Sequence, residues 1–295
     1  GGSLVIELRA PAKVNLTLRV GPKEGSYHPL DSLVQAVSLF DGVAVRVAAR
    51  DRVVAEDSPD VPLDDDNLAL RAIRALRNAG AAVPAVEIEL TKRIPTGAGL
   101  GGGSADAAAA LVAGHQLAGS PQGIDLARVA ARVGSDVPAL LVGGTIRMTG
   151  RGEETAPLSP VTSPSWLLAT PPFACSTADV YRRWDDLGGP SDSPRAWPRT
   201  SAETGLGPLN DLEPAAIDVQ PQLGRWLDSL SALAGLRAMV SGSGSSVFVE
   251  VPDESVLAEA VADPLLATAR HLSVVQPVGH GPVTGGGRDQ AGTDR

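Results

Sequence analysis

A glycine-rich loop that opens a helix constrains this chain more than any other feature of its sequence. Five glycines stand within residues 97–103, and an alanine-rich stretch follows over residues 104–117. Glycine adopts positive φ angles and lets backbone N–H groups approach a ligand, and a helix N-terminus adds unpaired N–H groups and about half a positive charge. The segment therefore predicts a cradle for a phosphate group. A tight strand-to-helix connection is the purely structural alternative.

Two common nucleotide-binding patterns can be tested against this loop. A Walker loop requires Lys and then Ser or Thr directly after its last glycine, but here Ser104 and Ala105 follow, which excludes that class. The dinucleotide pattern G-x-G-x-x-G does start at Gly97, yet it needs a strand after the helix to complete a βαβ unit. Residues 124–134 have helical apolar spacing instead, so a nicotinamide-dependent oxidoreductase is only a weak alternative.

The pattern of polar and apolar residues predicts mixed strands and helices. Residues 13–20 alternate strictly, as in a half-buried strand, which places Lys13, Asn15 and Thr17 together on one face. Asn67 precedes an amphipathic stretch that ends at Gly80, which predicts a capped helix. Further strands are expected at residues 33–39, 43–47, 86–90, 166–169, 237–241, 246–251 and 272–276, and further helices at 124–134, 178–187 and 222–234.

Changes in composition suggest the domain boundaries. Proline, serine and glycine dominate residues 155–165 and 188–208, and the last stretch is glycine-rich and polar without an apolar period. We expect an N-terminal domain over residues 4–160, a C-terminal domain over residues 161–278 and a disordered tail over residues 279–295.

Charge and cysteine content narrow the classes of partner. The chain has 34 acidic and 25 basic residues and a net charge of −9, which argues against nonspecific binding to nucleic acid or to an anionic membrane. Its single cysteine, Cys175, allows no internal disulfide, which suits a reducing compartment. We therefore expect a cytoplasmic protein that binds a small phosphorylated molecule, with no nucleic-acid, membrane or obligate protein partner.

Three motifs in a fixed order resemble the GHMP kinase superfamily, which includes galactokinase, homoserine kinase and mevalonate kinase. They are residues 10–16, residues 95–107 and a second glycine-rich loop at residues 240–248. The resemblance implies an α+β fold with an N-terminal ribosomal-protein-S5-like domain and a C-terminal ferredoxin-like domain, and an active site between them. It also implies an ATP-dependent phosphotransferase with an alcohol acceptor.

Within that superfamily the chain is most similar to the branch that acts on 4-diphosphocytidyl-2-C-methyl-D-erythritol. The residues that carry the similarity are 13–16, 27–30, 66–68, 101–107, 134–138 and 210–213. The resemblance implies transfer of the γ-phosphoryl group of ATP, with Mg²⁺, to the 2-hydroxyl of that alcohol in non-mevalonate isoprenoid precursor biosynthesis. A kinase of the mevalonate or homoserine type is the nearest alternative, and a noncatalytic metabolite sensor on the same fold is another.

The resemblance also assigns the catalytic pair. Asp136 matches the catalytic base that accepts the hydroxyl proton, and Lys13 matches the lysine beside it. Asp136 could instead be only a helix cap before Val137, and Lys13 only a solvated strand lysine. Against the second alternative, the chain has three lysines and 22 arginines, so a lysine is an uncommon choice here.

Substrate and nucleotide residues follow from the same resemblance. Tyr27 and His28 would hold the cytidine end by stacking and hydrogen bonding, with Asn15, Thr177 and Tyr181 as further substrate residues. The expected ATP-binding residues are Asn67, Lys92, Pro95, Gly97, Gly99, Gly101, Gly102, Gly103, Ser104, Gly242, Ser243 and Gly244. Tyr181 could instead be a core tyrosine, Asn67 a helix cap and Lys92 a surface lysine. Ser104 is a candidate Mg²⁺ ligand, and the other ligands stay unassigned.

Overall fold

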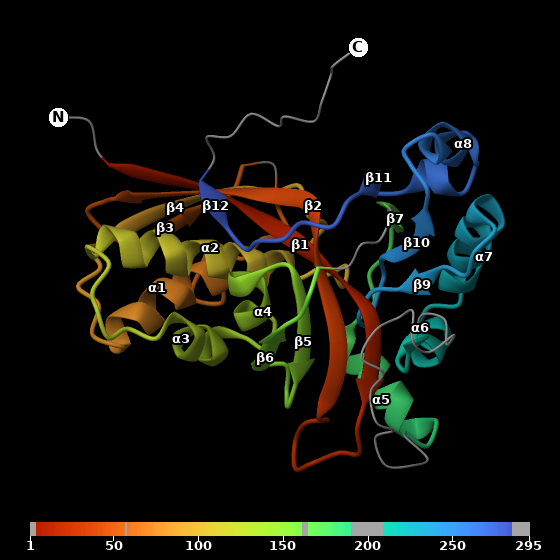
Figure 1. Cartoon of the computed structure of the whole chain (residues 1–295), viewed down its shortest axis with the longest axis horizontal. Coiled ribbons are helices and arrows are strands. Elements are labelled where there is room, and N and C mark those ends of the chain that lie inside the picture. Colours follow the sequence, from red (N-terminus) through yellow and green to blue (C-terminus); the bar gives the residue numbers. More distant parts are fainter. Residues whose placement is uncertain (1–3, 57, 161–164, 190–208, 285–295) are drawn as a thin grey trace.

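The computed structural model describes residues 4–56, 58–160, 165–189 and 209–284. In these residues the chain forms an 8-stranded and a 4-stranded β-sheet, both covered by helices (Figure 1). The larger sheet contains β1 (Val5–Val20), β2 (Leu30–Val47), β3 (Arg52–Val54), β4 (Val86–Thr91), β5 (Thr145–Thr149), β6 (Glu154–Pro157), β8 (Leu209–Asn210) and β12 (Val283–Thr284). The smaller sheet has the order β11 (His271–Val275), β7 (Ser165–Thr170), β10 (Val247–Val251) and β9 (Met239–Val240).

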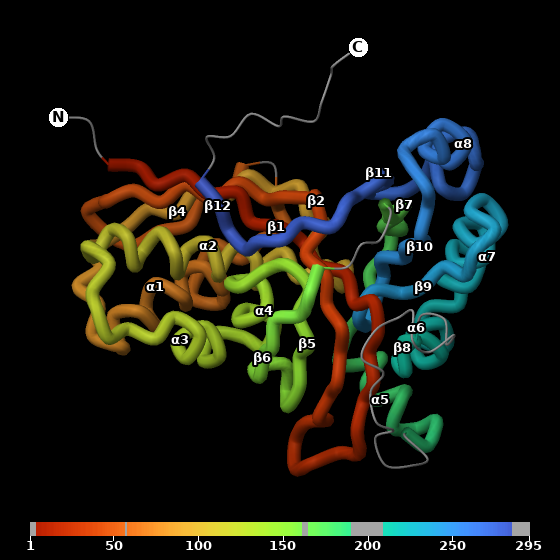
Figure 2. The backbone as a smooth tube through the Cα atoms, viewed as in Figure 1, coloured from red at the N-terminus to blue at the C-terminus, as the bar shows by residue number. Residues whose placement is uncertain are grey.

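The long antiparallel pair β1 and β2 is the spine of the larger sheet. Its register runs from Val5 opposite Arg46 to Val20 opposite Leu30. Figure 2 shows that these two strands run from the part of the larger sheet that helices cover to the neighbourhood of α5 (Thr177–Asp186). The two strands therefore contribute residues both to the hydrophobic core of the larger sheet and to a second hydrophobic core beside α5.

Four helices cover one face of the larger sheet: α1 (Leu68–Asn78), α2 (Gly102–Leu117), α3 (Leu126–Val133) and α4 (Val137–Val142) (Figure 1). Asn67 caps α1, as its sequence predicts, because its Oδ1 accepts the N–H groups of Ala69 and Leu70. The alanines of α2 are buried, and Gly114 lets α1 approach closely, since a Cβ there would lie 2.7 Å from Cδ1 of Ile73. Small side chains thus set the depth at which α2 lies.

A second hydrophobic core lies between the smaller sheet and its helices. These helices are α5, α6 (Glu213–Val219), α7 (Gln222–Ala234) and α8 (Val256–Ala262), followed by the 3₁₀ turn Leu266–Thr268. All six residues of β7 are buried, and Trp226 of α7 is 1% exposed. The mixed helix and sheet content confirms the predicted α+β class.

Segments of the C-terminal half return to the larger sheet. β8 pairs in parallel with β1, and β12 pairs with β1 at Arg9 opposite Val283. Residues 279–284 do not form the disordered tail that we expected over residues 279–295, since Val283 and Thr284 pair with β1. Residues 285–295 lie outside the described residues. Backbone pairing, which needs no apolar pattern, holds this short strand.

Two further differences concern the elements near the glycine loop. The strands expected at residues 33–39 and 43–47 are one continuous strand, β2, with a shift of register between Pro11 and Ala12 of β1 that accommodates the irregularity. A short helix, α4, which is not among the helices expected from apolar spacing, follows α3; it begins at Val137 with Pro138 in its first turn.

Candidate active site

The first glycine loop, residues 95–103, connects β4 to α2 and bears positive φ angles at alternate residues. The φ angles of Gly97, Gly99 and Gly101 are +66°, +78° and +72°, a region that residues with a Cβ rarely adopt. Gly101 is the N-cap of α2 and contributes no side-chain hydrogen bond. The first N–H groups of α2 therefore face a cap without a side-chain acceptor, which suits an anion.

The second glycine loop, residues 241–246, contacts the first. Ser241 Oγ donates to Gly99 O at 2.9 Å, and Ser246 N donates to Ala98 O at 3.0 Å. Asn210 holds the second loop from behind, since its Nδ2 donates to Gly242 O at 2.7 Å. Two loops separated by more than 130 residues thus form one glycine-rich surface.

Lys13, on β1, lies against both loops. Its ammonium donates to Gly99 O at 3.0 Å and to Asn15 Oδ1 at 2.6 Å, and it lies 3.6 Å from Asp136 Oδ2. The side chain of Lys13 is 7% exposed, whereas that of Asp136 is 36% exposed. Asn15 in turn donates to Ser32 Oγ at 2.8 Å, so the polar face expected of β1 is an interior hydrogen-bonded face.

Asp136 occupies the N-cap position of α4 but makes no side-chain capping hydrogen bond. The helix-cap alternative therefore describes its backbone and not its carboxylate. A partly exposed carboxylate beside a buried ammonium can accept a proton from an incoming hydroxyl, while the ammonium stabilises the charge of the pair.

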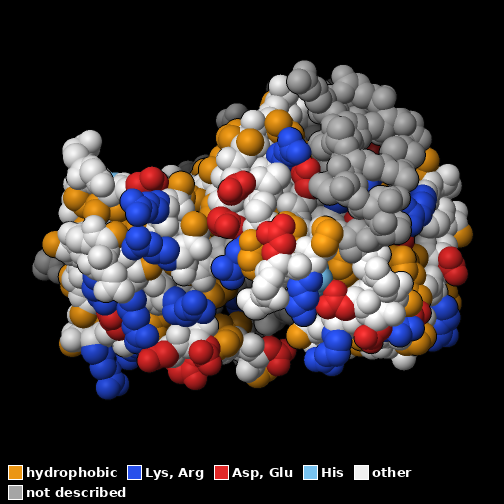
Figure 3. All heavy atoms as spheres, turned by 90° about the horizontal axis from the view of Figure 1, so that it is seen from below, with side chains coloured by type: hydrophobic (Ala, Val, Ile, Leu, Met, Phe, Trp, Pro, Cys, Tyr) orange, Lys and Arg blue, Asp and Glu red, His pale blue; other side chains and the backbone are white. Residues whose placement is uncertain are grey.

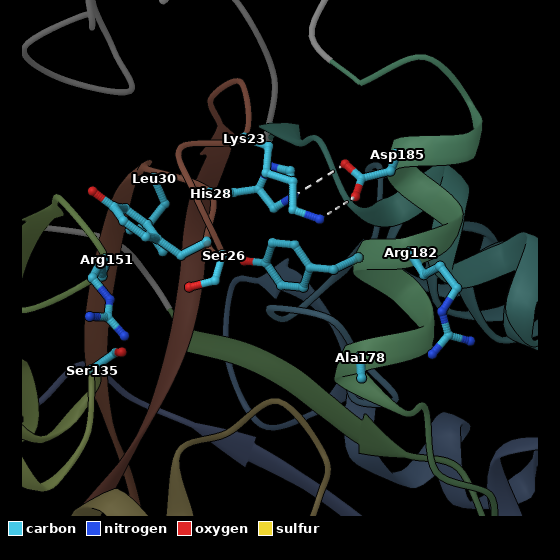
Figure 4. Close-up of a pocket in the computed structure, with 11 residues that line it drawn as sticks. Lys23, Ser26, His28, Leu30, Ser135, Arg151, Ala178, Arg182 and Asp185 are labelled. Carbon is cyan, nitrogen blue, oxygen red and sulfur yellow. Dashed lines mark ion pairs between the residues drawn. The ribbon is translucent and has the colours of Figure 1, made fainter.

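A pocket of about 440 Å³ lies between the β1–β2 turn and α5. Figure 4 shows Arg151 and Ser135 on one side of it, and Ala178, Arg182 and Asp185 on α5 opposite them. The face drawn in Figure 3 is hollowed between its two halves and carries basic and acidic side chains together rather than one basic patch.

Aromatic rings and one carboxylate shape this pocket. The ring of His28 stacks on Tyr181 with centroids 5.7 Å apart, and His28 Nε2 lies 3.1 Å from Asp185 Oδ1. Tyr27 is half-buried at the opposite wall, where its hydroxyl donates to Glu24 Oε2 at 3.3 Å, a bond that raises the pKa of Tyr27. Rings with polar atoms around them can stack on a heterocyclic base and bond its edge.

Tyr181 is both part of the second core and a wall of the pocket. Burial, with a smaller effect of the Asp136 charge, raises its pKa to about 12. Its hydroxyl therefore stays protonated at neutral pH. On the same helix, Thr177 Oγ1 lies 2.8 Å from Ser243 Oγ, which joins α5 to the second glycine loop. Tyr181 therefore packs on the second core and also lines the pocket, and its contact with a substrate stays a prediction.

Asn67 and Lys92, expected near the nucleotide, are both engaged with the protein. Asn67 caps α1 and also donates through Nδ2 to Pro62 O at 2.7 Å. Lys92 is buried between Asp41 and Asp106, so the surface-lysine alternative is wrong. Burial lowers the pKa of Lys92, but the attraction of Asp106 and Asp41 outweighs it and raises that pKa overall.

Three acidic residues near the site were missed in the sequence. Asp185 stands four residues after Tyr181, so it shares a helix face with Tyr181, and that spacing could have found it. Asp106 lies in the predicted helix α2, but nothing in its local pattern marks it as buried. Asp41 has no local signal, because its partners Lys92, Arg93 and Ile94 lie just after β4, more than 50 residues away.

No group of three or more His, Cys, Asp or Glu side chains that could hold a metal ion occurs in the part of the chain that the structure describes. In that same part, no helix is long and apolar enough to cross a membrane.

Comparisons with known proteins agree with this geometry. Residues 67–144 match the family described as GHMP kinases N terminal domain, and residues 199–265 match GHMP kinases C terminal. A 4-diphosphocytidyl-2-C-methyl-D-erythritol kinase of Nocardioides sp. (strain JS614) is 39% identical over 299 residues, which cover 94% of this chain and 98% of that protein.

Solved structures show the same relationship. The crystal structure of a 4-(cytidine 5′-diphospho)-2C-methyl-D-erythritol kinase has a TM-score of 0.74 and 34% identity, covering 92% of this chain and 99% of that one. A homoserine kinase from Cytophaga hutchinsonii shares the fold, with a TM-score of 0.71 at 21% identity over 95% of this chain and 96% of that one. The chain therefore belongs to the 4-diphosphocytidyl-2-C-methyl-D-erythritol kinase family of the GHMP kinase superfamily.

Proposed function

We propose that the chain transfers the γ-phosphoryl group of ATP to the 2-hydroxyl of 4-diphosphocytidyl-2-C-methyl-D-erythritol, in the non-mevalonate route to isoprenoid precursors. The observation that carries this proposal is the position of the Lys13–Asp136 pair. Lys13 donates to Gly99 O of the first loop, to which Ser241 of the second loop also donates, and Ser135, the residue before Asp136, lines the pocket. A nucleotide site and an alcohol site can therefore meet at this pair.

Asp136 would accept the proton of the 2-hydroxyl as the oxygen attacks the γ-phosphorus. Phosphoryl transfer depends mostly on positioning and on stabilising charge, so a single correctly placed acceptor suffices. Lys13 would hold the carboxylate in place through their ion pair, while its bonds to Asn15 and Gly99 hold the ammonium. Asn15 accepts a hydrogen bond from Lys13 and would help to orient the acceptor alcohol beside it.

The glycine loops and the start of α2 would bind the triphosphate. Backbone N–H groups at a helix N-terminus bind phosphate without a basic side chain, which suits a chain with a net charge of −9. The residues that we assign to ATP are the first-loop residues Pro95, Gly97, Gly99, Gly101, Gly102, Gly103 and Ser104, and the second-loop residues Gly242, Ser243 and Gly244. Asn67 and Lys92 would act from behind this surface.

The residues present fit Mg²⁺ delivered with ATP. Mg²⁺ at nucleotide sites keeps several waters and takes only one or two protein ligands together with the phosphates, so no separate metal cluster is required. Ser104, half-buried in the first turn of α2, is the hydroxyl that we propose for it. When bound, the ion would neutralise phosphate charge.

The pocket beside α5 would receive the cytidine end. Tyr27, His28 and Tyr181 supply aromatic faces, and Thr177 links that helix to the loop that we assign to the phosphates. Mevalonate and homoserine have no heterocycle to fill such a pocket, so this feature favours a cytidine-bearing alcohol. We assign residues 4–160 to the nucleotide-binding domain, residues 161–278 to the second domain, and the cytoplasm as the place of action, where Cys175 would remain a free thiol.

A coupled assay of ATP consumption tests the proposal. The three acceptors are the diphosphocytidyl alcohol, mevalonate and homoserine, each with MgATP. We expect turnover with the first and at least about a hundredfold lower kcat/KM with the other two, since a missing base leaves polar pocket groups unpaired. Equal or better turnover of mevalonate or homoserine would assign another kinase specificity. ATP binding without turnover of any acceptor would indicate a sensor.

A further inference from the structure

A buried cluster of three charged side chains lies behind the first glycine loop, and the proposed chemistry does not use it. Asp41 comes from β2, Lys92 follows β4, and Asp106 belongs to α2. The exposed fractions of the three side chains are 0%, 8% and 5%. Two buried ion pairs of Lys92 therefore link β2, the end of β4 and α2 (Figure 1).

Asp41 fixes the backbone where it enters the loop. Its Oδ1 accepts the N–H groups of Arg93 at 2.6 Å and of Ile94 at 2.9 Å, the two residues directly before Pro95. Its Oδ2 pairs with the ammonium of Lys92. One carboxylate therefore orders the whole connection between β4 and the loop.

Lys92 extends this connection to α2. Its Nζ lies 2.6 Å from Asp106 Oδ2, and it stands 3.4 Å from the place where a Cβ would be at Gly102, the first residue of the helix. The ammonium is therefore packed against the first turn of α2. Any shift of that turn would change a buried ion pair.

Stability alone does not account for this cluster. Two carboxylates and one ammonium leave an unbalanced charge, Asp106 Oδ1 has no hydrogen-bond partner among the described residues, and burial raises the pKa of Asp106 to about 7. Apolar side chains of similar volume are often as stable as a buried ion pair, or more so. What a buried ion-pair cluster adds is a defined geometry, since each carboxylate oxygen accepts only from donors at set positions.

We propose that Asp41, Lys92 and Asp106 are positioning residues that hold the first turn of α2 and the first glycine loop in the geometry that binds ATP, and that Lys92 acts through Asp106 and not by contact with the nucleotide. The proposal rests on the proposed function, because it takes this loop as the ATP site. It differs from the role that the family resemblance implied for Lys92, which was direct binding of ATP.

The experiment is a double-mutant cycle read by calorimetric titration of MgATP without the alcohol. Lys92→Met keeps most of the side-chain stem, and Asp106→Ala suits an alanine-rich helix. We expect each single variant to weaken ATP binding about tenfold, and the double variant to be no weaker than the worse single variant, because both remove the same contact. The KM for the alcohol should change by less than about twofold.

The chain contains a matched control at the other end of β4. Asp51 Oδ1 accepts the N–H of Val86 at 3.0 Å, and Asp51 pairs with Arg77 of α1, so it joins the same strand to a different helix. Asp51→Ala should lower the melting temperature but leave the Kd for MgATP within about twofold of wild type. An equal loss of ATP binding in Asp51→Ala would reduce the cluster to a general structural role and overturn the proposal.

Other outcomes are equally decisive. If Lys92→Met weakens ATP binding while Asp106→Ala does not, Lys92 contacts the nucleotide and the proposal is wrong. If Asp106→Ala does not fold, Asp106→Asn removes only the charge and should weaken binding about threefold; no change in Kd would again reject the proposal. A wild-type chain that binds no MgATP would instead refute the proposed function, which the acceptor assay tests separately.

Discussion

Gly99 and Ser241 lie in contact although 142 residues separate them: Ser241 Oγ donates to Gly99 O at 2.9 Å, and the Ser241 carbonyl oxygen fills the space that a Cβ at residue 99 would need. The same Gly99 carbonyl accepts from Lys13 Nζ at 3.0 Å. The proposed catalytic lysine and both glycine loops therefore share one carbonyl group. A shift of either loop would move the lysine.

Gly99→Ala should be one of the most damaging small substitutions in the chain. It combines a positive φ angle with overlap against the Ser241 carbonyl, so we expect a loss of about 2–4 kcal/mol in the free energy of unfolding. Gly97→Ala is the matched control, since φ is also positive there but no atom of the other described residues lies within 4 Å of the new Cβ; a loss of about 1 kcal/mol is expected. Urea unfolding measures both, and equal losses would show that the loop contact contributes nothing.

Asp136→Asn should lower kcat by about two to four orders of magnitude, because an amide cannot accept the hydroxyl proton. The KM values should change far less, since Asn keeps the size of the side chain. Asp125→Asn is the control: Asp125 caps α3 through the N–H of Arg128 and should leave kcat within about twofold. Steady-state kinetics measures both variants, and near-normal turnover of Asp136→Asn would remove Asp136 from the proposed mechanism.

Tyr181→Ala should raise the KM for the cytidine-bearing alcohol about tenfold and leave the KM for ATP within about twofold, because it removes an aromatic wall of the pocket. Tyr181→Phe keeps the ring. Since the hydroxyl stays protonated with a pKa of about 12, we expect this variant to remain within about twofold of wild type. Equal effects of the two variants on the alcohol KM would assign the role to the hydroxyl and not to stacking.

Asp185→Asn should also raise the KM for the alcohol, by about threefold, because it weakens the hold on His28, whose Nε2 lies 3.1 Å from the carboxylate. Asp218→Asn is a control on the neighbouring helix α6, since Asp218 pairs with the half-exposed Arg183 of α5, which does not line the pocket. That variant should change neither KM by more than about twofold. An unchanged alcohol KM in Asp185→Asn would mean that His28 is positioned without it.

The buried Asp106 predicts a pH dependence of stability. Burial raises its pKa in the folded state from 3.8 to about 7, so the folded protein holds the proton more tightly than the unfolded chain does. This contribution to stability is complete below about pH 4 and is lost as the pH rises through about 7, with a slope of at most about 1.4 kcal/mol per pH unit. Asp106→Asn does not titrate, so its stability relative to wild type should increase over that range in urea unfolding at pH 5, 6, 7 and 8. A constant difference would show that Asp106 is ionised throughout.

Much of the local structure could be predicted from the sequence, because near neighbours decide it. The alternation of residues 13–20 indicates β1, the Asn67 cap indicates the start of α1, and the glycines before Ser104 indicate a loop with positive φ angles that opens α2. The family, too, follows from motifs that are short and contiguous, and the comparisons confirm it.

Only the tertiary structure decided which distant residues meet. Asp41 bonds the backbone at Arg93 and Ile94, Asp185 reaches His28 across the pocket, and β12 returns to pair with β1. Such contacts depend on how helices and sheets pack, and a residue's immediate neighbours carry no trace of a partner more than 50 positions away. The sequence by itself determined the strand periods, the helix caps, the glycine conformations and the family. Packing decided that Lys92 is buried in an ion-pair cluster and is not a surface cation, because burial depends on the atoms of every element around the side chain.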